Sequence, residues 1–296
     1  MVNVQNLAVV SQDQEDFLGH LAWYSVGKQL IKTNELKQRL LNSGLEAEWL
    51  PNPIRATDAF RRATKEVEQR KATSRPNVFE NILVREVFSD KQAVQRNLVV
   101  ETVDQNGKRL SYNSKAGVIT LDKKNNSVTF LSDDTSINEV CVQIEQKFNI
   151  YKDHYSAQQL RVMVNKIMQS LAPTPVRKNG GIYFIPATKS IRLKQLIQFL
   201  SFLDNSEGYK VPVIDSTDNR VMVSKKIYDH FDSILYDCRN KTRLTKGEVK
   251  ALIDEANKVI KDYRNYKTIV TEETEHIEQV IMNVRHEVTQ MVADVQ

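Results

Sequence analysis

The chain has 296 residues, a length that corresponds to about two domains, and 41% of the residues are hydrophobic while 27% are charged. This is the composition of a globular protein with a sizeable core. Only 9 glycines and 7 prolines occur, which excludes collagen-like and linker-rich proteins. A formal net charge of +5 allows contact with nucleic acid without requiring it.

The two cysteines, Cys141 and Cys238, lie far apart in the sequence, and neither belongs to a Cys-x-x-Cys pair. This pattern predicts a reduced chain without a disulfide scaffold, and therefore a cytoplasmic protein. The N-terminus lacks the basic and apolar regions of a signal peptide, and no stretch is long and apolar enough to span a membrane. We therefore expect no membrane partner.

Residues 13–43 are predicted to be helical, because apolar residues recur at helical spacing around most of the circumference. His20, within this segment, is predicted to be a packing residue. Gly44 stands where a glycine commonly ends a helix, here one over residues 35–42. A further helix is expected from Thr57 to about Arg70, with a largely basic surface.

Residues 78–131 change character, because β-branched and aromatic residues dominate and alternation replaces the helical period. Asn106 and Gly107 form an Asn-Gly pair, which is typical of a tight hairpin. The segment therefore predicts a small antiparallel meander, which together with the N-terminal helices makes up a domain over residues 1–132.

Residues 133–220 predict a compact α+β unit with the outline of a winged helix: two helices, a tight hairpin around Gly180 and Gly181, a third helix and a strand. Such a unit could place a helix in a DNA groove and the hairpin on phosphates. The alternative is that its charges are only solvated and that its hairpin aromatics belong to a sheet core. The candidate nucleic-acid contacts are Arg161, Lys166, Arg177 and Lys178.

Residues 221–296 predict a helical arm, since from Glu248 onward there is neither glycine nor proline and apolar residues recur every seven positions. An unbroken helix would extend about 70 Å. Three arrangements remain open: a projecting arm, a coiled coil with another copy, or two helices folded back around residues 266–274. A long apolar stripe needs a partner, so we expect a homo-oligomer. The residues expected to mediate it are Val270, Ile277, Ile281, Val284, Val288, Met291 and Val295.

The fold class predicted by these segments is α+β. It comprises a helical N-terminal segment, an antiparallel β-meander, a compact α+β middle unit and a long C-terminal helical arm.

Catalytic motifs are missing from the sequence: there is no GxxxxGK[ST] or GxGxxG loop, and no HExxH or HxH pair among the 5 histidines. A catalytic group could be drawn from five neighbouring residues: Asp229, His230, Asp232, Asp237 and Cys238. The favoured interpretation is instead that they belong to a solvated amphipathic segment.

Paired carboxylates such as Asp215 and Asp218 stand in turn-like contexts and are predicted to serve turns and helix caps. We therefore predict no catalytic, cofactor-binding or metal-binding residues, no cofactor, and a protein that is not an enzyme.

Three phrases of the chain resemble an uncharacterised family found in phages and bacteria: FLGHLAWYSVGKQL from Phe17, WLPNPIRATDAFRRAT from Trp49, and VRKNGGIYFIP from Val176. The size of the chain, its lack of an active site and its helical terminus are also similar to the phage anti-Gabija protein, which blocks a bacterial defence complex by assembling around it. The resemblance implies a non-enzymatic, self-assembling inhibitor whose partner is a Gabija-type defence nuclease of the host. The alternative is a DNA- or RNA-binding accessory protein that uses the basic middle unit.

Overall fold

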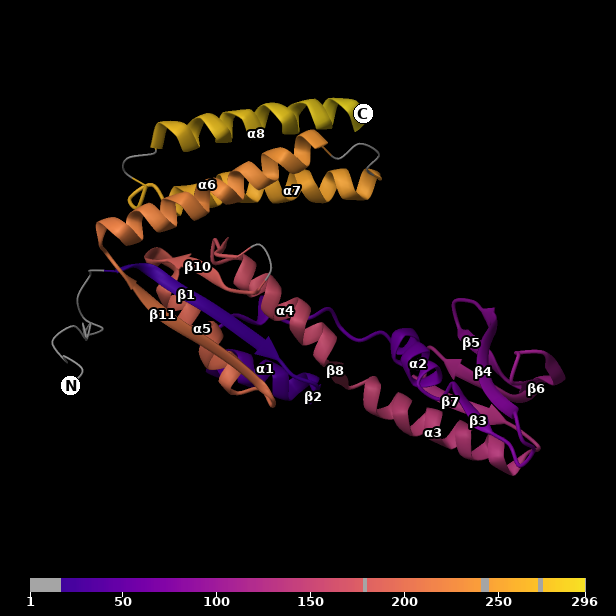
Figure 1. Ribbon diagram of the computed structural model, residues 1–296. Helices are drawn as coiled ribbons and strands as arrows, with labels where there is room; N and C mark the ends of the chain where they lie inside the picture. Colours follow the sequence, from indigo (N-terminus) through magenta and orange to yellow (C-terminus); the bar gives the residue numbers. More distant parts are fainter. Residues whose placement is uncertain (1–16, 178–179, 241–244, 271–273, 296) are drawn as a thin grey trace, which may run out of the picture. The chain divides into compact units, whose positions relative to one another are not determined.

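Figure 1 shows the computed structural model, which describes residues 17–177, 180–240, 245–270 and 274–295. The described residues form two compact units. Unit 1 contains the described parts of Met1–Gln29, Lys37–Trp49 and Leu160–Gln296, and unit 2 contains Leu30–Leu36 and Leu50–Gln159. This grouping cuts across the predicted boundaries at 132/133 and 220/221, because the first strand of unit 1 pairs with strands from the second half of the chain.

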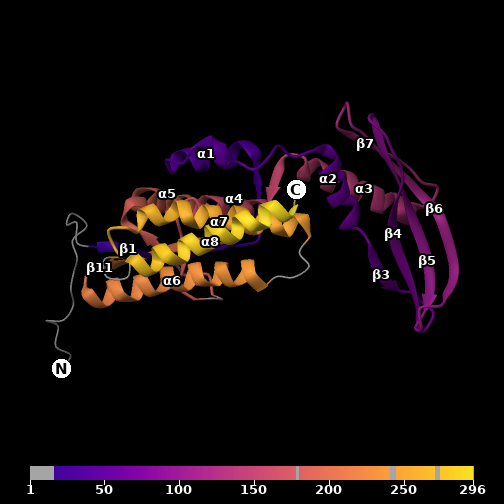
Figure 2. The same ribbon diagram turned by 90° about the horizontal axis from the view of Figure 1, so that it is seen from above.

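Unit 2 is built around an antiparallel sheet with the strand order β3-β4-β5-β6-β7, seen obliquely in Figure 2. The strands are β3 (Gln69–Ala72), β4 (Val78–Ser89), β5 (Ala93–Asp104), β6 (Arg109–Asp122) and β7 (Ser127–Leu131). The predicted meander is therefore confirmed, and Asn106 and Gly107 lie in the turn between β5 and β6, as the Asn-Gly pair indicated.

Two helices of unit 2, α2 (Ala56–Lys65) and α3 (Thr135–Tyr151), pack with this sheet around one core. The rings of Phe60 and Phe148 meet edge to face in that core, with centroids 6.4 Å apart. Asp134 caps α3 by accepting hydrogen bonds from the backbone of Ser136 and Ile137. The predicted helix from Thr57 to Arg70 is too long, because α2 ends at Lys65 and the following residues enter β3. A short antiparallel pair, β2 (Leu30–Lys32) with β8 (His154–Ser156), completes the unit.

Unit 1 contains a second antiparallel sheet with the order β11-β1-β10-β9. Its strands are β1 (Phe17–Val26), β9 (Thr174–Pro175), β10 (Tyr183–Pro186) and β11 (Ser206–Ile214). The helix predicted over residues 13–43 is wrong where β1 stands. As an inner strand, β1 has no exposed residue from Phe17 to Ala22, so its apolar residues there run nearly without interruption and imitate a buried helix.

The remaining helices around this sheet are α1 (Thr33–Asn42), α4 (Ala157–Gln169), α5 (Ser190–Ser201) and the short 3-10 turns η2 (Ala47–Trp49) and η3 (Ala187–Lys189). The helix expected over residues 35–42 is confirmed, and Gly44 has the positive φ of 83° that such a glycine end requires. The predicted winged-helix unit is divided, because α3 belongs to unit 2 whereas α4 from Leu160 onward belongs to unit 1.

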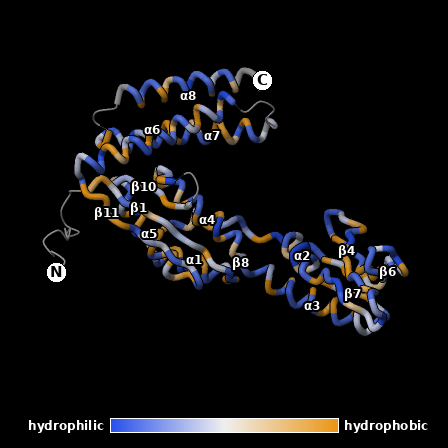
Figure 3. The backbone as a smooth tube through the Cα atoms, in the orientation of Figure 1, coloured by the Kyte–Doolittle hydropathy of each residue, from blue (hydrophilic) through white to orange (hydrophobic). Residues whose placement is uncertain are grey.

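The C-terminal part of the chain folds back on itself within unit 1. Its elements are α6 (Thr217–Asn240), α7 (Lys246–Asp262), the 3-10 turn η4 (Tyr263–Asn265) and α8 (Thr274–Val295). The three α-helices run side by side in Figures 1 and 2, and hydrophilic and hydrophobic stretches alternate along each of them in Figure 3. Of the three arrangements that the sequence left open, the folded-back one is therefore present.

The seven-residue stripe is covered inside the chain. Ile277, Ile281, Val284 and Val288 of α8, and Val270 before it, are buried in one core with residues of α6 and of the sheet. Met291 is half-buried, and the side chain of Val295 lies outside the described residues. The stripe is therefore buried within one molecule, and its burial does not by itself require a second copy of the chain. No helix in the described part of the chain is both long enough and apolar enough to cross a membrane.

Candidate interaction surfaces

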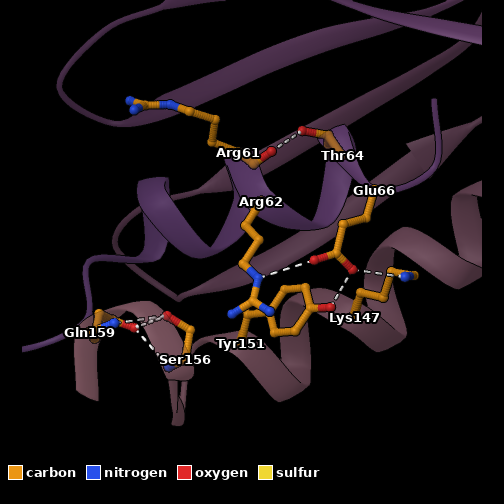
Figure 4. Close-up of polar contacts among 8 residues, drawn as sticks. All are labelled: Arg61, Arg62, Thr64, Glu66, Lys147, Tyr151, Ser156 and Gln159. Atoms are coloured by element: carbon orange, nitrogen blue, oxygen red, sulfur yellow. Dashed lines mark hydrogen bonds and ion pairs between the residues drawn. The ribbon is translucent and has the colours of Figure 1, made fainter. Parts of the chain in front are cut away.

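A cluster of polar side chains around Glu66 ties α2 to α3 (Figure 4). The carboxylate of Glu66 accepts hydrogen bonds from Arg62 Nε at 3.1 Å, from Lys147 Nζ at 3.0 Å and from the hydroxyl of Tyr151. The guanidinium of Arg62 also lies 3.8 Å above the centre of the Tyr151 ring. Burial acts to raise the pKa of Glu66, but the three donors outweigh it and hold that pKa below its usual value. A carboxylate engaged in this way holds two helices together.

The other polar groups in Figure 4 make hydrogen bonds near the ends of helices. The hydroxyl of Thr64 donates to the carbonyl oxygen of Arg61 at 3.0 Å, and Gln159 Oε1 accepts from the backbone nitrogen and the hydroxyl of Ser156 at 2.9 and 3.0 Å. The Arg61 side chain, 68% exposed, extends away from the Glu66 cluster. The cluster is therefore structural.

The group around His230 lines an open cleft of about 590 Å³ in unit 1. The lining residues include Asp229, His230, Asp232, Ser233, Asp237 and Glu255. Burial, reinforced by the Lys258 ammonium group, lowers the pKa of His230 to about 4. The side chain is thus neutral near pH 7. Cys238 packs partly buried against the core of unit 1. Within the described residues, no group of His, Cys, Asp or Glu side chains is arranged to hold a metal ion.

His20 is a buried, hydrogen-bonded residue, as predicted, although it lies on a strand. Its Nδ1 is 3.3 Å from the hydroxyl of Ser190, and its Nε2 is 3.5 Å from Lys210 Nζ. Burial, together with the charge of Lys210, lowers the pKa of His20 to about 4. The residue therefore packs as a neutral side chain.

The candidate nucleic-acid residues of the middle unit have separate surroundings. Arg161 donates from Nε at 3.1 Å and from Nη2 at 3.0 Å to the carbonyl oxygen of Val26, which fixes the end of β1. Lys166 and Arg177 are exposed, and Lys178 lies outside the described residues. The winged-helix outline that united these residues is not formed within either unit.

An exposed group of apolar side chains, which we call the aromatic edge, consists of Trp23, Tyr209 and Val211. The register pairs Trp23 with Tyr209 and Leu21 with Val211, so that all these side chains lie on one face of the sheet. The rings of Trp23 and Tyr209 are 5.7 Å apart between centroids. The three residues of the edge are 37%, 49% and 47% exposed.

A second surface, which we call the arginine–aromatic face, lies on the sheet of unit 2. It consists of Arg70, Phe79, Asn81, Glu101, Arg109 and Tyr112. The Arg70 guanidinium lies 4.2 Å from the centre of the Phe79 ring, and that of Arg109 lies 4.5 Å from the Tyr112 ring. Sequence reasoning named none of these residues, nor those of the aromatic edge. The alternation along the strands of the meander was visible, but β1 was not recognised as a strand, and the register between strands was not visible.

The comparisons with known proteins agree with the resemblance to an uncharacterised family. No curated protein and no solved structure matches the chain. The model of DUF6744, a family of unknown function, matches residues 17–296, which include all of the described residues. The chain therefore belongs to the family of unknown function DUF6744.

Proposed function

We propose that this chain is a phage or prophage counter-defence protein that binds and blocks a bacterial defence complex of the Gabija nuclease type, and that it acts by binding rather than by catalysis. The proposal begins from the resemblance of its sequence to a family of phages and bacteria and from its similarity in size to the anti-Gabija protein. The observation that carries it further is the aromatic edge of unit 1.

The aromatic edge has the properties of a protein-binding surface. Exposed apolar side chains that lie together, rather than singly, commonly mark interfaces. Trp and Tyr are also the residues most enriched among those that dominate binding energy. Within the described residues β11 is an outer strand of its sheet. Its Pro212 and Lys210 disfavour simple addition of another strand, so the face of Trp23 and Tyr209 is the better candidate.

Self-assembly, in this proposal, does not use the apolar stripe of α8. Ile277 and Val284 are both 0% exposed, so that neither can contact a second copy without unfolding the bundle. Copies that surround a target would instead contact one another through exposed residues, and the aromatic edge would contact the target.

Binding can be tested with a purified Gabija-type nuclease complex. The chain is expected to co-elute with the complex in size-exclusion chromatography and to inhibit its DNA cleavage. The double variant Trp23→Ala with Tyr209→Ala should weaken binding by tenfold or more, because truncating an aromatic anchor commonly costs about 2 kcal/mol or more. Ile191→Ala in α5, where the side chain is 80% exposed, is the matched control and should bind like the parent. Absence of co-elution by the parent chain contradicts the proposal.

Catalysis is not part of the proposal, and we expect the purified chain neither to hydrolyse nucleotides nor to cleave DNA with Mg²⁺ or Mn²⁺. Asp215 is the carboxylate to examine first. It accepts from Arg220 Nε and Nη2, both at 2.6 Å, and this contact lowers its pKa. Arg220 also donates to the carbonyl oxygens of Thr268 and Ile269 at 2.9 and 3.2 Å. Turnover that is abolished by Asp215→Asn would contradict this expectation.

A further inference from the structure

We propose that the arginine–aromatic face of unit 2 binds single-stranded nucleic acid. This surface is separate from the aromatic edge of unit 1 and from the middle-unit residues considered above. Its function would be additional to the binding of a defence complex, and either activity can fail in experiment without the other.

The face is the side of the sheet opposite the helices. Ile82 and Leu98 belong to the core shared with α2 and α3. Because side chains alternate along a strand, Phe79, Asn81 and Glu101, at odd positions in the continuous β4–β5 register, lie on the other side.

The register arranges the surface in rows across the strands. Arg70, Asn81, Glu101 and Tyr112 face one another in sequence from β3 to β6, and Phe79 pairs with Val103, which pairs with Arg109, in the next row. Neighbouring strands are about 4.8 Å apart, so the row from β3 to β6 extends over about 14 Å. A surface of this width can contact several consecutive bases.

The rings and arginines offer the contacts that unpaired bases use. Tyr112 is 49% exposed and the Arg109 side chain is 60% exposed, so both can be reached from solvent. Unpaired bases stack on aromatic rings and on guanidinium planes, and the arginines also attract phosphates. In duplex DNA the faces of the bases are stacked on one another and cannot be reached. A sheet that offers stacking groups should therefore bind a single strand more tightly than a duplex.

The charge of the face also suits a polyanion. Among the described residues that the register places on it from the Phe79 row to the Arg85 row, three are arginines (Arg70, Arg85 and Arg109) and one is acidic. A second acid, Glu68, stands just before β3, and its carboxylate lies 3.9 Å from the Arg85 guanidinium. The first acid, Glu101, is only 14% exposed, and it accepts from Asn81 Nδ2 at 3.0 Å and from Arg109 Nε at 3.2 Å. The Glu101 carboxylate is thus covered and partnered, and the arginines outnumber the acids, which leaves an excess of positive charge at the surface.

The experiment is a titration of the full chain into fluorescein-labelled oligothymidylate, oligouridylate and duplex DNA of about 20 nucleotides, followed by fluorescence anisotropy. We expect at least one of the two single strands to bind more tightly than the duplex. If oligothymidylate binds more tightly than oligouridylate, the ligand is single-stranded DNA, and if the order is reversed it is single-stranded RNA. Tyr112→Leu should weaken binding about tenfold, and Tyr112→Phe should retain it because the ring is kept.

The arginine contribution is measured through salt. Arg70→Gln and Arg109→Gln should each reduce the slope of log affinity against log salt by about 0.7. Arg61→Gln removes the same charge from the outer side of α2 and should change neither affinity nor slope. These charge variants keep the proposal testable if Tyr112→Leu does not fold. Failure of both single strands to bind, equal or tighter binding of the duplex, or an equal loss in Arg61→Gln would overturn it.

Discussion

The hydroxyl of Thr174 donates to the phenolic oxygen of Tyr266 at 2.9 Å, and Tyr266 in turn donates to the carbonyl oxygen of Ala172. Tyr266 is 3% exposed, and burial raises its pKa well above the usual value, so that the hydroxyl keeps its proton. These two bonds join the segment that follows α7 to β9. They anchor the folded-back C-terminal helices to the sheet of unit 1.

Tyr266→Phe is expected to lower the free energy of unfolding by about 1–3 kcal/mol, because it leaves the Ala172 carbonyl and the Thr174 hydroxyl without their partner in a buried place. Denaturant titration followed by circular dichroism measures the change. Thr174→Val tests the same contact, and the double variant should be less destabilised than the sum of the two single variants. Strict additivity would show that the hydroxyl pair contributes nothing of its own.

The stability of the protein should fall as the pH is lowered from about 6.5 to about 4. In this range the unfolded chain binds protons on His20 and His230, whose ordinary pKa is 6.5, whereas burial lowers both pKa values to about 4 in the folded chain. The unfolded state therefore binds more protons, and the free energy of unfolding decreases with decreasing pH. Denaturant titrations at several pH values measure the slope. His20→Gln and His230→Gln should each reduce it, and a flat profile for the parent would contradict the assignment.

The hairpin between β9 and β10 depends on a backbone conformation that suits glycine. The tight hairpin predicted around these glycines is present, and φ is positive at Gly180, with 149°, and at Gly181, with 64°, while Asn179 lies outside the described residues. A Cβ at Gly181 would meet no atom within 4 Å, so a substitution there tests the backbone alone. Gly181→Ala should cost about 1 kcal/mol, and Gly181→Asn less, because Asn tolerates this region better. Thermal melts that do not separate the two variants would contradict this account.

The sequence predicts those parts of the fold that depend on neighbouring residues. The alternation over residues 78–131 predicts the meander of unit 2, and the glycine at position 44 predicts a helix end. The strand β1 is misread because none of its residues from Phe17 to Ala22 is exposed, so that this half lacks the alternation of a half-exposed strand. A buried inner strand and a buried helix have similar apolar runs.

The two candidate surfaces could not be predicted, because each depends on the register between strands. Trp23 lies beside Tyr209 because β1 pairs with β11. Arg70 and Tyr112 share a row because β4 and β5 lie between their strands in a continuous register. For the C-terminal helices, the seven-residue repeat predicts which apolar residues must be buried. It does not distinguish burial against another copy of the chain from burial against α6.

Intramolecular packing of α8 predicts how two substitutions on the same helix should differ. Ile277 is 0% exposed and lies in the core of unit 1, whereas Met282 is 54% exposed. Ile277→Ala should lower the free energy of unfolding by about 2–5 kcal/mol, the usual cost of a cavity in a packed core, while Met282→Ala should have little effect. Because the stripe is covered within one chain, the loss of stability in Ile277→Ala should be the same at low and at high protein concentration. Denaturant titrations at low and high protein concentration measure this. A midpoint that rises with concentration in the parent, and does so less in Ile277→Ala, would show that the stripe is covered by a second copy instead.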